Sequence, residues 1–458
     1  MAETTSDLVV LGGGSGGYAA ALRAAQLGLS VTLVEEDKLG GTCLHNGCIP
    51  TKALLHAAEV ADATREADRF GIRASFDGVD VPAVHAYRDG VVDRLHQGLR
   101  GLVASRGITV VAGRGTLVAA DAVRVGEDTH RASRAVVLAT GSYARSVPGI
   151  ELGGRILSST EALALDHVPE RVVVLGGGVI GVEFASVWRS FGAEVTVVEA
   201  LPSLVPNEDE AIGKALQRAF TKRGIGVRTG ARVASVAQTA DAVTVVLEGG
   251  TELVADQLLV AVGRGPRTAD LGYDDVGVEL DRGFVKVDET LRTTVPGVYA
   301  VGDIVPGLQL AHRGFQQGIF VAETLAGLDP VPVPESSIPR VTYSDPEVAS
   351  VGLTEAQARA VHGDEVETVS YNLGGNGKSQ ILGTTGFVKL VRQRGGPVLG
   401  VHLVGARVGE LIGEAQLAVA WEAYPEDVAG LVHAHPTQDE ALGEAFLALA
   451  GKPLHAHD

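Results

Sequence analysis

Two segments of this chain repeat one pattern at the same spacing. Each segment begins with an apolar strand, enters a helical stretch through G-x-G-x-x-G, and returns as a second apolar strand that ends in glutamate. The first segment runs from Leu8 to Glu35, and the second runs from Val172 to Glu199. This order of strand, glycine turn, helix and strand is typical of a doubly wound α/β unit. The repeat therefore predicts an α/β fold with two Rossmann-like units.

Each glycine turn predicts a binding site for an adenine dinucleotide. The glycines let the backbone approach a pyrophosphate, which the N–H groups at the start of the helix can bind. The glutamate at the end of the second strand can accept hydrogen bonds from the adenosine ribose. The residues expected in these roles are Gly12, Gly14, Gly17 and Glu35 in the first segment and Gly176, Gly178, Gly181 and Glu199 in the second. The alternative is that these glycines serve tight packing alone.

The second glutamate also discriminates between the nicotinamide dinucleotides. The Glu199 carboxylate would bind the 2′-hydroxyl of NAD and repel the 2′-phosphate of NADP. A site for NADP would favour a nearby arginine, but Ala200, Leu201 and Pro202 follow the glutamate. The second unit is therefore expected to bind NAD.

The chain has only two cysteines, Cys43 and Cys48, and both lie in one glycine-rich segment. A disulfide across the four residues between them would close a small loop and so would stabilise the fold little. A structural zinc site usually gathers several cysteine or histidine ligands in paired short spacings, and no second cluster accompanies this pair. A redox pair and a pair of ordinary buried thiols are the remaining interpretations.

The residues after the cysteines favour redox exchange. Pro50 suits the first turn of a helix, which we expect over residues 51–67. Cys48 would then lie near the positive end of the helix dipole, and Lys52 would follow one turn later. Both features favour a thiolate over a thiol. We therefore interpret the cysteines as an exchange-active pair.

Size and charge exclude several classes of protein. A chain of 458 residues exceeds what one hydrophobic core usually supports, so two to four domains are expected. The net charge of -18 argues against binding nucleic acid or anionic lipid through bulk electrostatics. The sequence shows no secretory signal and no apolar run long enough to span a membrane. A reducing cytoplasm is the expected compartment, where a cysteine pair is more often catalytic than structural.

Two apolar runs are expected to close the nucleotide units as buried parallel strands. They cover residues 135–142 and 258–264, and they stop at Gly141 and Gly263.

A later strand, within residues 294–303, is predicted to end at Asp303. This position would place the carboxylate at the edge of a sheet where ligands bind. The alternative is that Asp303 caps a helix over residues 311–325.

The last part of the chain differs in character. Several prolines between residues 329 and 339 predict a domain boundary. Alternating residues at 386–391 and 398–404 predict antiparallel strands, followed by helices from Gly409 and Pro425. This part is expected to form an α+β domain.

A histidine and a carboxylate in this domain form a candidate acid/base pair. His435 precedes Pro436, and Glu440 follows close behind. Such a carboxylate could hold the imidazole as an oriented base. The alternatives are that His433 and His435 bind a metal, or that both are loop histidines without a chemical role.

Together these segments resemble the pyridine nucleotide disulfide oxidoreductases over essentially the whole chain, and most closely the members that oxidise dihydrolipoamide. The family's redox motif, G-G-T-C-x-x-x-G-C-x-P-[ST]-K, is present from Gly40 to Lys52. Its centre reads Leu-His-Asn, with His45 where the family usually has asparagine. The resemblance implies an FAD-binding domain at 1–148, an NAD-binding domain at 149–268, a second part of the FAD-binding domain at 269–335, and a dimerisation domain at 336–458.

The resemblance also implies a role for each candidate residue. Cys43 would exchange with substrate sulfur, Cys48 would face the flavin, and Lys52 would lie near the flavin's reactive edge. His435, oriented by Glu440, would act as acid and base at the disulfide of the other subunit, so an obligate homodimer is expected. The first glycine turn would bind FAD and the second NAD, and the further expected cofactor contacts are Gly141, Glu183, Gly263 and Asp303.

The activity implied by the resemblance is oxidation of dihydrolipoamide on the lipoyl groups of acyltransferase proteins, with FAD and NAD as cofactors and no metal. Two alternatives stay open. One is another disulfide or metal-ion reductase of the family, such as glutathione or mercuric reductase, although Glu199 disfavours NADPH and no cysteine follows Cys48. The other is a flavoprotein that acts mainly in the assembly of a complex.

Overall fold

The computed structural model describes residues 2–456, and these divide into two compact units. The first unit contains the residues up to Ala53 together with Pro82–Arg145 and Gly263–Glu335. The second contains Leu54–Val81, Ser146–Val262 and the residues from Ser336 onward. The predicted boundaries of four domain segments stay a prediction. Within residues 2–456, no helix is both long enough and apolar enough to cross a bilayer.

The first unit is built on a mixed sheet in the order β3-β2-β1-β6-β5-β4, with β19 also paired to β6. Strands β1, β2, β3, β6 and β19 run parallel, whereas β4, β5 and β6 form an antiparallel meander. The strands are β1 (Glu3–Leu11), β2 (Val31–Glu35), β3 (Thr109–Ala112), β4 (Gly115–Ala119), β5 (Ala122–Val125), β6 (Asp128–Leu138) and β19 (Val298–Ala300). The sequence predicted only the apolar end of β1, because its exposed polar start is held by pairing with β6.

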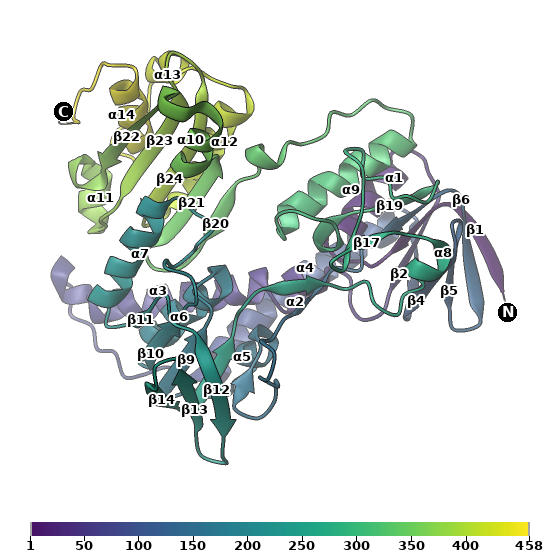
Figure 1. Cartoon of the computed structure of the whole chain (residues 1–458), viewed down its shortest axis with the longest axis horizontal. Helices are drawn as coiled ribbons and strands as arrows, with labels where there is room; N and C mark the ends of the chain where they lie inside the picture. Colours follow the sequence, from purple (N-terminus) through teal and green to yellow (C-terminus); the bar gives the residue numbers. More distant parts are fainter. Residues whose placement is uncertain (1, 457–458) are drawn as a thin grey trace. The chain divides into compact units, whose positions relative to one another are not determined.

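Helices α1 (Ser15–Gln26) and α9 (Ala311–Leu325) pack against each other in the first unit (Figure 1). Glycines permit this approach, because a Cβ atom at Gly318 would lie 2.3 Å from the carbonyl oxygen of Gly16. The predicted bounds of α9 are confirmed. The unit also contains α2 (Gly41–His45), α4 (Val81–Ser105), α8 (Tyr273–Val276), the 3₁₀ turn η2 (Gly302–Ile304), the paired strands β7 (Ser142–Ala144) and β16 (Arg264–Pro266), and the hairpin of β17 (Leu280–Asp281) and β18 (Phe284–Val285).

Helix α3 (Cys48–Arg65) begins in the first unit and continues in the second. The sequence predicted a helix over residues 51–67, so the start of that prediction was wrong by three residues. A proline is tolerated throughout the first helical turn, where its missing N–H has no helical partner. Cys48 therefore lies in the first turn itself.

The second unit contains a parallel sheet in the order β11-β10-β9-β15-β8. Its strands are β8 (Ile156–Leu157), β9 (Arg171–Leu175), β10 (Glu194–Val198), β11 (Gly226–Arg228) and β15 (Gln257–Val260). Helices α5 (Ser159–Leu163), α6 (Val179–Phe191) and α7 (Glu210–Lys222), the 3₁₀ turn η1 (Ala67–Phe70) and the antiparallel strands β12 (Val233–Gln238), β13 (Val243–Leu247) and β14 (Glu252–Ala255) complete this part. The predicted strand, glycine turn, helix and strand are confirmed.

The end of the chain forms an antiparallel sheet in the order β20-β21-β24-β23-β22. The strands are β20 (Arg340–Thr342), β21 (Glu347–Gly352), β22 (Val366–Asn372), β23 (Phe387–Gln393) and β24 (Val398–Gly405). The helices are α10 (Glu355–His362), α11 (Gly377–Leu382), α12 (Val408–Ala420), α13 (Pro425–Ala429) and α14 (Glu440–Leu449), with 3₁₀ turns η3 (Glu335–Ser337), η4 (Gly363–Glu365) and η5 (Leu373–Gly375). The predicted α+β character is confirmed, and so is the fold class as a whole.

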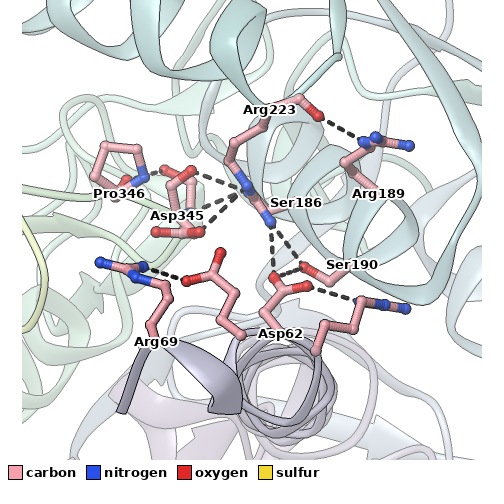
Figure 2. Close-up of polar contacts among 11 residues, drawn as sticks. Asp62, Arg69, Ser186, Arg189, Ser190, Arg223, Asp345 and Pro346 are labelled. Atoms are coloured by element: carbon pink, nitrogen blue, oxygen red, sulfur yellow. Dashed lines mark hydrogen bonds and ion pairs between the residues drawn. The ribbon is translucent and has the colours of Figure 1, made fainter. Parts of the chain in front are cut away.

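A polar network joins four segments inside the second unit (Figure 2). Asp62 on α3 accepts a hydrogen bond from Ser190 Oγ on α6 at 2.5 Å. Arg223, just after α7, donates through Nη2 to Asp62 at 3.0 Å and to Ser190 at 2.8 Å. Its Nε lies 3.2 Å from the carboxylate of Asp345. One guanidinium therefore links the end of α6 to α3 and to the segment before β21.

Candidate functional site

The first glycine turn is too crowded for larger residues. Gly12 adopts a left-handed conformation, with φ of 106°, and a Cβ atom at Gly17 would lie 1.8 Å from its carbonyl oxygen. Helix α1 starts directly after Gly14, which has no side chain to satisfy the first N–H groups of the helix. The nearest atom to a Cβ at Gly14 is 4.0 Å away. The turn therefore offers open space beside unsatisfied amides, which suits a pyrophosphate.

The Glu35 carboxylate is oriented by the backbone of this turn. Its Oε2 accepts a hydrogen bond from the Gly13 N–H at 2.6 Å, and its Oε1 accepts one from the Asp37 N–H at 2.9 Å. Each carboxylate oxygen has a second lone pair with which to accept a hydroxyl. Glu35 therefore lies against the glycine turn, and its contact with an adenosine ribose stays a prediction.

The second glycine turn reproduces this geometry closely. Gly176 has φ of 113°, and a Cβ atom at Gly181 would lie 1.9 Å from the Gly176 oxygen. The Glu199 carboxylate accepts hydrogen bonds from the N–H groups of Gly177 and Leu201, both at 2.7 Å. Space beside Gly178 is open, because no atom lies within 4 Å of a Cβ there. The residues of the second turn thus also fit a dinucleotide.

Glu183 belongs to α6, one turn into the helix. Its side chain is only 2% exposed, and its carboxylate accepts a hydrogen bond from the Tyr343 N–H at 3.0 Å. This buried carboxylate therefore joins the second glycine-turn helix to the end of β20. Its expected position beside a nicotinamide stays a prediction.

The two cysteines are reduced thiols on adjacent helices. Cys43 lies in the one-turn helix α2, and Cys48 is the first residue of α3. The pKa of Cys43 is raised, first by its hydrogen bond with Cys48, then by burial and by the charge on Cys48. Lys52 acts in the opposite direction. The hydrogen bond with Cys48 and the charge on Cys48 therefore disfavour a thiolate at Cys43.

Asp303 lies in η2, just after β19, and is part of a side-chain relay. Ser142 Oγ donates to Asp303 Oδ2 at 2.6 Å, and Arg264 Nε donates to Ser142 Oγ at 2.7 Å. Burial lowers the pKa of Arg264, while the charge of Asp303 opposes that shift. The alternative that Asp303 caps α9 is wrong, because Leu310 occupies the N-cap position.

The sequence reasoning did not single out Ser142 or Arg264. Each follows directly after a predicted cofactor glycine, Gly141 or Gly263, and both glycines have positive φ with open space beside them. The antiparallel pairing of β7 with β16 brings the two side chains together. Their positions directly after the two predicted glycines were the sequence signal that could have identified them.

His435 and Glu440 form a hydrogen-bonded pair in the second unit. His435 Nδ1 lies 2.8 Å from Glu440 Oε1, and the Thr437 N–H donates to the other carboxylate oxygen at 2.8 Å. Although burial opposes the shift, these hydrogen bonds hold the pKa of Glu440 below its usual value. The His435 side chain is 79% exposed, so its second ring nitrogen can meet a substrate.

His433 has a different partner. Its Nε2 lies 2.9 Å from the Glu414 carboxylate. Across residues 2–456, no group of three or more histidine, cysteine, aspartate or glutamate side chains has an arrangement that could hold a metal ion. The two histidines of this segment therefore each pair with a carboxylate.

Comparison with known families covers nearly the whole chain. The family model described as pyridine nucleotide-disulphide oxidoreductase matches residues 6–318. The model of that family's dimerisation domain matches residues 338–446. Members of this family bind FAD and a pyridine nucleotide, which agrees with the two glycine turns described above.

Two relatives match this chain over nearly its whole length. A dihydrolipoyl dehydrogenase of Bacillus subtilis is 40% identical over 472 residues, covering 99% of each chain. A leghemoglobin reductase of Glycine max is also 40% identical, covering 99% of this chain and 89% of the relative.

Solved structures of similar proteins agree in fold. LpdA from Mycobacterium tuberculosis superposes with a TM-score of 0.90 at 29% identity, covering 97% of this chain and 99% of the other. The HOCl-induced flavoprotein disulfide reductase RclA from Escherichia coli gives 0.85 at 27% identity, covering 96% and 99%. This chain therefore belongs to the pyridine nucleotide-disulphide oxidoreductase family and is a flavoprotein disulfide reductase of its lipoamide dehydrogenase group.

Proposed function

We propose that the protein oxidises dihydrolipoamide to lipoamide and reduces NAD⁺. The observation that carries this proposal is the inequality of the two thiols, in which a hydrogen bond with Cys48, burial and the charge on Cys48 raise the pKa of the Cys43 thiol. A dithiol oxidant needs such a division, because one sulfur must exchange with substrate while the other leaves as a thiolate. The full-length likeness to dihydrolipoyl dehydrogenases supports dihydrolipoamide as the substrate.

Substrate oxidation begins with proton transfer to His435. The substrate thiolate attacks the Cys43 sulfur of the oxidised pair, the Cys43–Cys48 bond breaks, and Cys48 leaves as a thiolate. The second substrate thiol then attacks the substrate sulfur of the mixed disulfide, which forms oxidised lipoamide and returns Cys43 to the reduced state. Glu440 stabilises the imidazolium that His435 becomes, as the 2.8 Å hydrogen bond allows.

The two glycine turns hold the proposed cofactors. The first turn, Glu35 and the Asp303 relay would hold FAD, and the second turn with Glu199 and Glu183 would hold NAD. Gly141 and Gly263 provide open backbone beside the relay, and Lys52 a positive charge beside the thiols. When bound, FAD accepts the electron pair of the reduced thiols and delivers it to NAD⁺ as hydride.

The proposed active form is a homodimer. The dimerisation domain identified by the family comparison supports this state, and in it the His435 of one subunit serves the thiol pair of its partner. We propose that its natural substrates are lipoyl groups carried by acyltransferase proteins, and that it works in the reducing cytoplasm, where the thiols are kept available.

The spectrum of the reduced protein tests the central proposal. Addition of dihydrolipoamide or NADH should produce a long-wavelength band, because a Cys48 thiolate next to the flavin donates charge to it. Cys48→Ser should abolish this band, whereas Cys43→Ser should retain it and lose turnover. A purified yellow protein without the band in either reduction would contradict the proposal.

The His435–Glu440 pair predicts a defined kinetic effect. Glu440→Gln should lower turnover by roughly tenfold to hundredfold while sparing flavin content, because the imidazolium loses its carboxylate. Glu414→Gln is the matched control, since Glu414 pairs with the neighbouring His433. Because the pKa of Glu440 is lowered in the folded protein, its ionised carboxylate contributes to the free energy of unfolding above pH 4.5. This contribution is lost as the pH falls through the pKa of the folded state. Equal turnover in the two variants would remove Glu440 from the mechanism.

A second candidate function is reduction of another disulfide or of a metal ion. The likeness to RclA favours it, since solved structures of that reductase include a Cu(II) complex. NADH-driven rates with lipoamide, glutathione disulfide, mercuric ion and Cu(II) separate the candidates. The proposal requires lipoamide to be the best substrate of the four by kcat/KM.

A further inference from the structure

The helix that carries Cys43 is too short to be stable alone. Helix α2 contains five residues, and isolated helices of this length do not persist in water. It is entered through Gly40 and Gly41, whose φ values of 107° and 59° are left-handed. No side chain caps its N-terminus. Its position therefore depends on contacts that its side chains make with the rest of the first unit.

Leu44 and His45 make such contacts. Leu44 is buried, and a Cβ atom at Gly40 would overlap it at 2.3 Å. His45 Nε2 lies 2.9 Å from the carbonyl oxygen of Leu39. The His45 ring also meets the ring of His96 on α4 edge to face, with centroids 4.8 Å apart and planes at 86°. This ring contact joins the short redox helix to a long helix of the same unit.

The charges around His96 favour its neutral form. Its pKa is lowered, first by burial, then by the charge of His45, and further by Arg100 on α4 and Lys38 before α2. Asp93 on α4 opposes these effects. A neutral ring presents an electron-rich face to the edge of its partner. Acid that protonates His96 would add a positive charge beside the His45 ring and near Arg100 and Lys38.

We propose that His45 and His96 are positioning residues for Cys43, because their ring contact fixes α2 on α4 and thereby fixes the exchanging thiol relative to Cys48. This inference rests on the proposed function, in which Cys43 exchanges with substrate sulfur. The contact strengthens above the lowered pKa of His96 and is lost as the pH falls through it.

Three substitutions in the full-length flavoprotein separate ring contact from charge. His96→Gln removes the ring, His96→Phe keeps a ring that cannot be protonated, and His45→Asn introduces the usual family residue. His56→Gln is the matched control, because His56 is an exposed histidine of α3 that pairs with Glu59. The thiolate-to-flavin band of the reduced protein is recorded from pH 5 to pH 8.

The ring contact predicts a specific pattern. His96→Gln and His45→Asn should weaken the band by about twofold or more at pH 7.5, as expected for loss of one aromatic pair. His96→Phe should retain the band and lose the acid step that the lowered pKa of His96 predicts for wild type below pH 6.5. His56→Gln should match wild type throughout. A His96→Gln variant with the wild-type band and acid step would overturn the inference.

Thiol alkylation tests the positioning role of His45 and His96 independently of the proposed enzymatic function. In a Cys48→Ser background only Cys43 can react with iodoacetamide, so the rate reports the surroundings of that thiol alone. Adding His96→Gln should change this rate by about twofold or more, while adding His96→Phe should not. Absence of the band in wild type would contradict the proposed function, whereas equal alkylation rates in these backgrounds would contradict the positioning role.

Discussion

The two glycine turns share their local geometry but differ in what surrounds them. In each, a left-handed glycine, a glycine pressed against its carbonyl oxygen, and a glutamate bonded to the turn backbone recur with nearly equal distances. Helix α1 packs against α9 through glycines, whereas most residues of α6 are buried, among them Phe184 and Trp188. The same local geometry thus recurs in two different surroundings, and we expect each turn to hold a different dinucleotide.

The largest effect is expected in the first turn. Gly17→Ala places a methyl group 1.8 Å from the Gly12 oxygen, so the turn must open or the helix must shift. We expect loss of flavin and about 3 kcal/mol or more of stability. The flavin-to-protein absorbance ratio and urea unfolding measure both. A yellow Gly17→Ala protein of normal stability would show that this turn does not hold FAD.

The equivalent change in the second turn should separate the two cofactors. Gly181→Ala creates the same overlap, 1.9 Å from the Gly176 oxygen. Flavin content should remain near wild type, while NADH binding should weaken by at least about tenfold. Titration of the flavin with NADH and with dihydrolipoamide distinguishes loss of NADH binding from loss of flavin. Equal loss of flavin in both glycine variants would contradict the expectation that the two turns hold different cofactors.

The two glutamates should respond differently as well. Glu199→Ala should reduce the preference for NADH over NADPH by about tenfold or more, because a charged hydrogen-bond acceptor and its repulsion of the 2′-phosphate are both lost. Steady-state kinetics with the two nucleotides measure this ratio. Glu35→Ala is the control, and it should lower flavin affinity while leaving the ratio unchanged. A changed ratio in the control would mean that Glu35 also meets the nicotinamide nucleotide.

The smallest effect on stability is expected at the C-terminal ends of α1 and α6, the helices that follow the two glycine turns. Arg23 near the end of α1 bonds Glu323 at 2.8 Å, and Ser190 near the end of α6 bonds Asp62 (Figure 2). Asp62→Asn should cost about 1–2 kcal/mol, because Arg223 also depends on this carboxylate. Glu323→Gln should cost less than about 1 kcal/mol, as for a partly exposed two-residue ion pair. Thermal unfolding of both variants, with Asp68→Asn as an exposed control, tests this order.

The sequence predicts best what backbone sterics and periodicity determine. Both glycine turns and the bounds of α9 follow from residues that act within a few positions of one another. The start of α3 was placed too late, because a proline marks the first turn without marking its first residue. The exposed start of β1 was missed, since only its partner strand β6 holds it.

The candidate site was predictable where one motif contains its residues. The cysteines, His435 and Glu440 each lie in short segments, and the hydrogen bond of the second pair is confirmed. The Asp303–Ser142–Arg264 relay was not predictable, because Ser142 precedes Arg264 by 122 residues and Asp303 by 161, and the three meet only through the sheet and the β7–β16 pairing. The ring contact of His45 with His96 depends in the same way on how α4 lies beside α2.

The first sheet includes β19, so this sheet can be completed only late in the synthesis of the chain. Strand β19 pairs with β6 but begins roughly 160 residues after β6 ends. The residues between the two strands include the whole second glycine turn. At about 5–20 residues per second, a ribosome needs on the order of ten to thirty seconds to supply these residues. The second turn can therefore close while the first still lacks an edge strand and Asp303. We expect nascent chains to acquire the NAD-type turn before they can retain flavin.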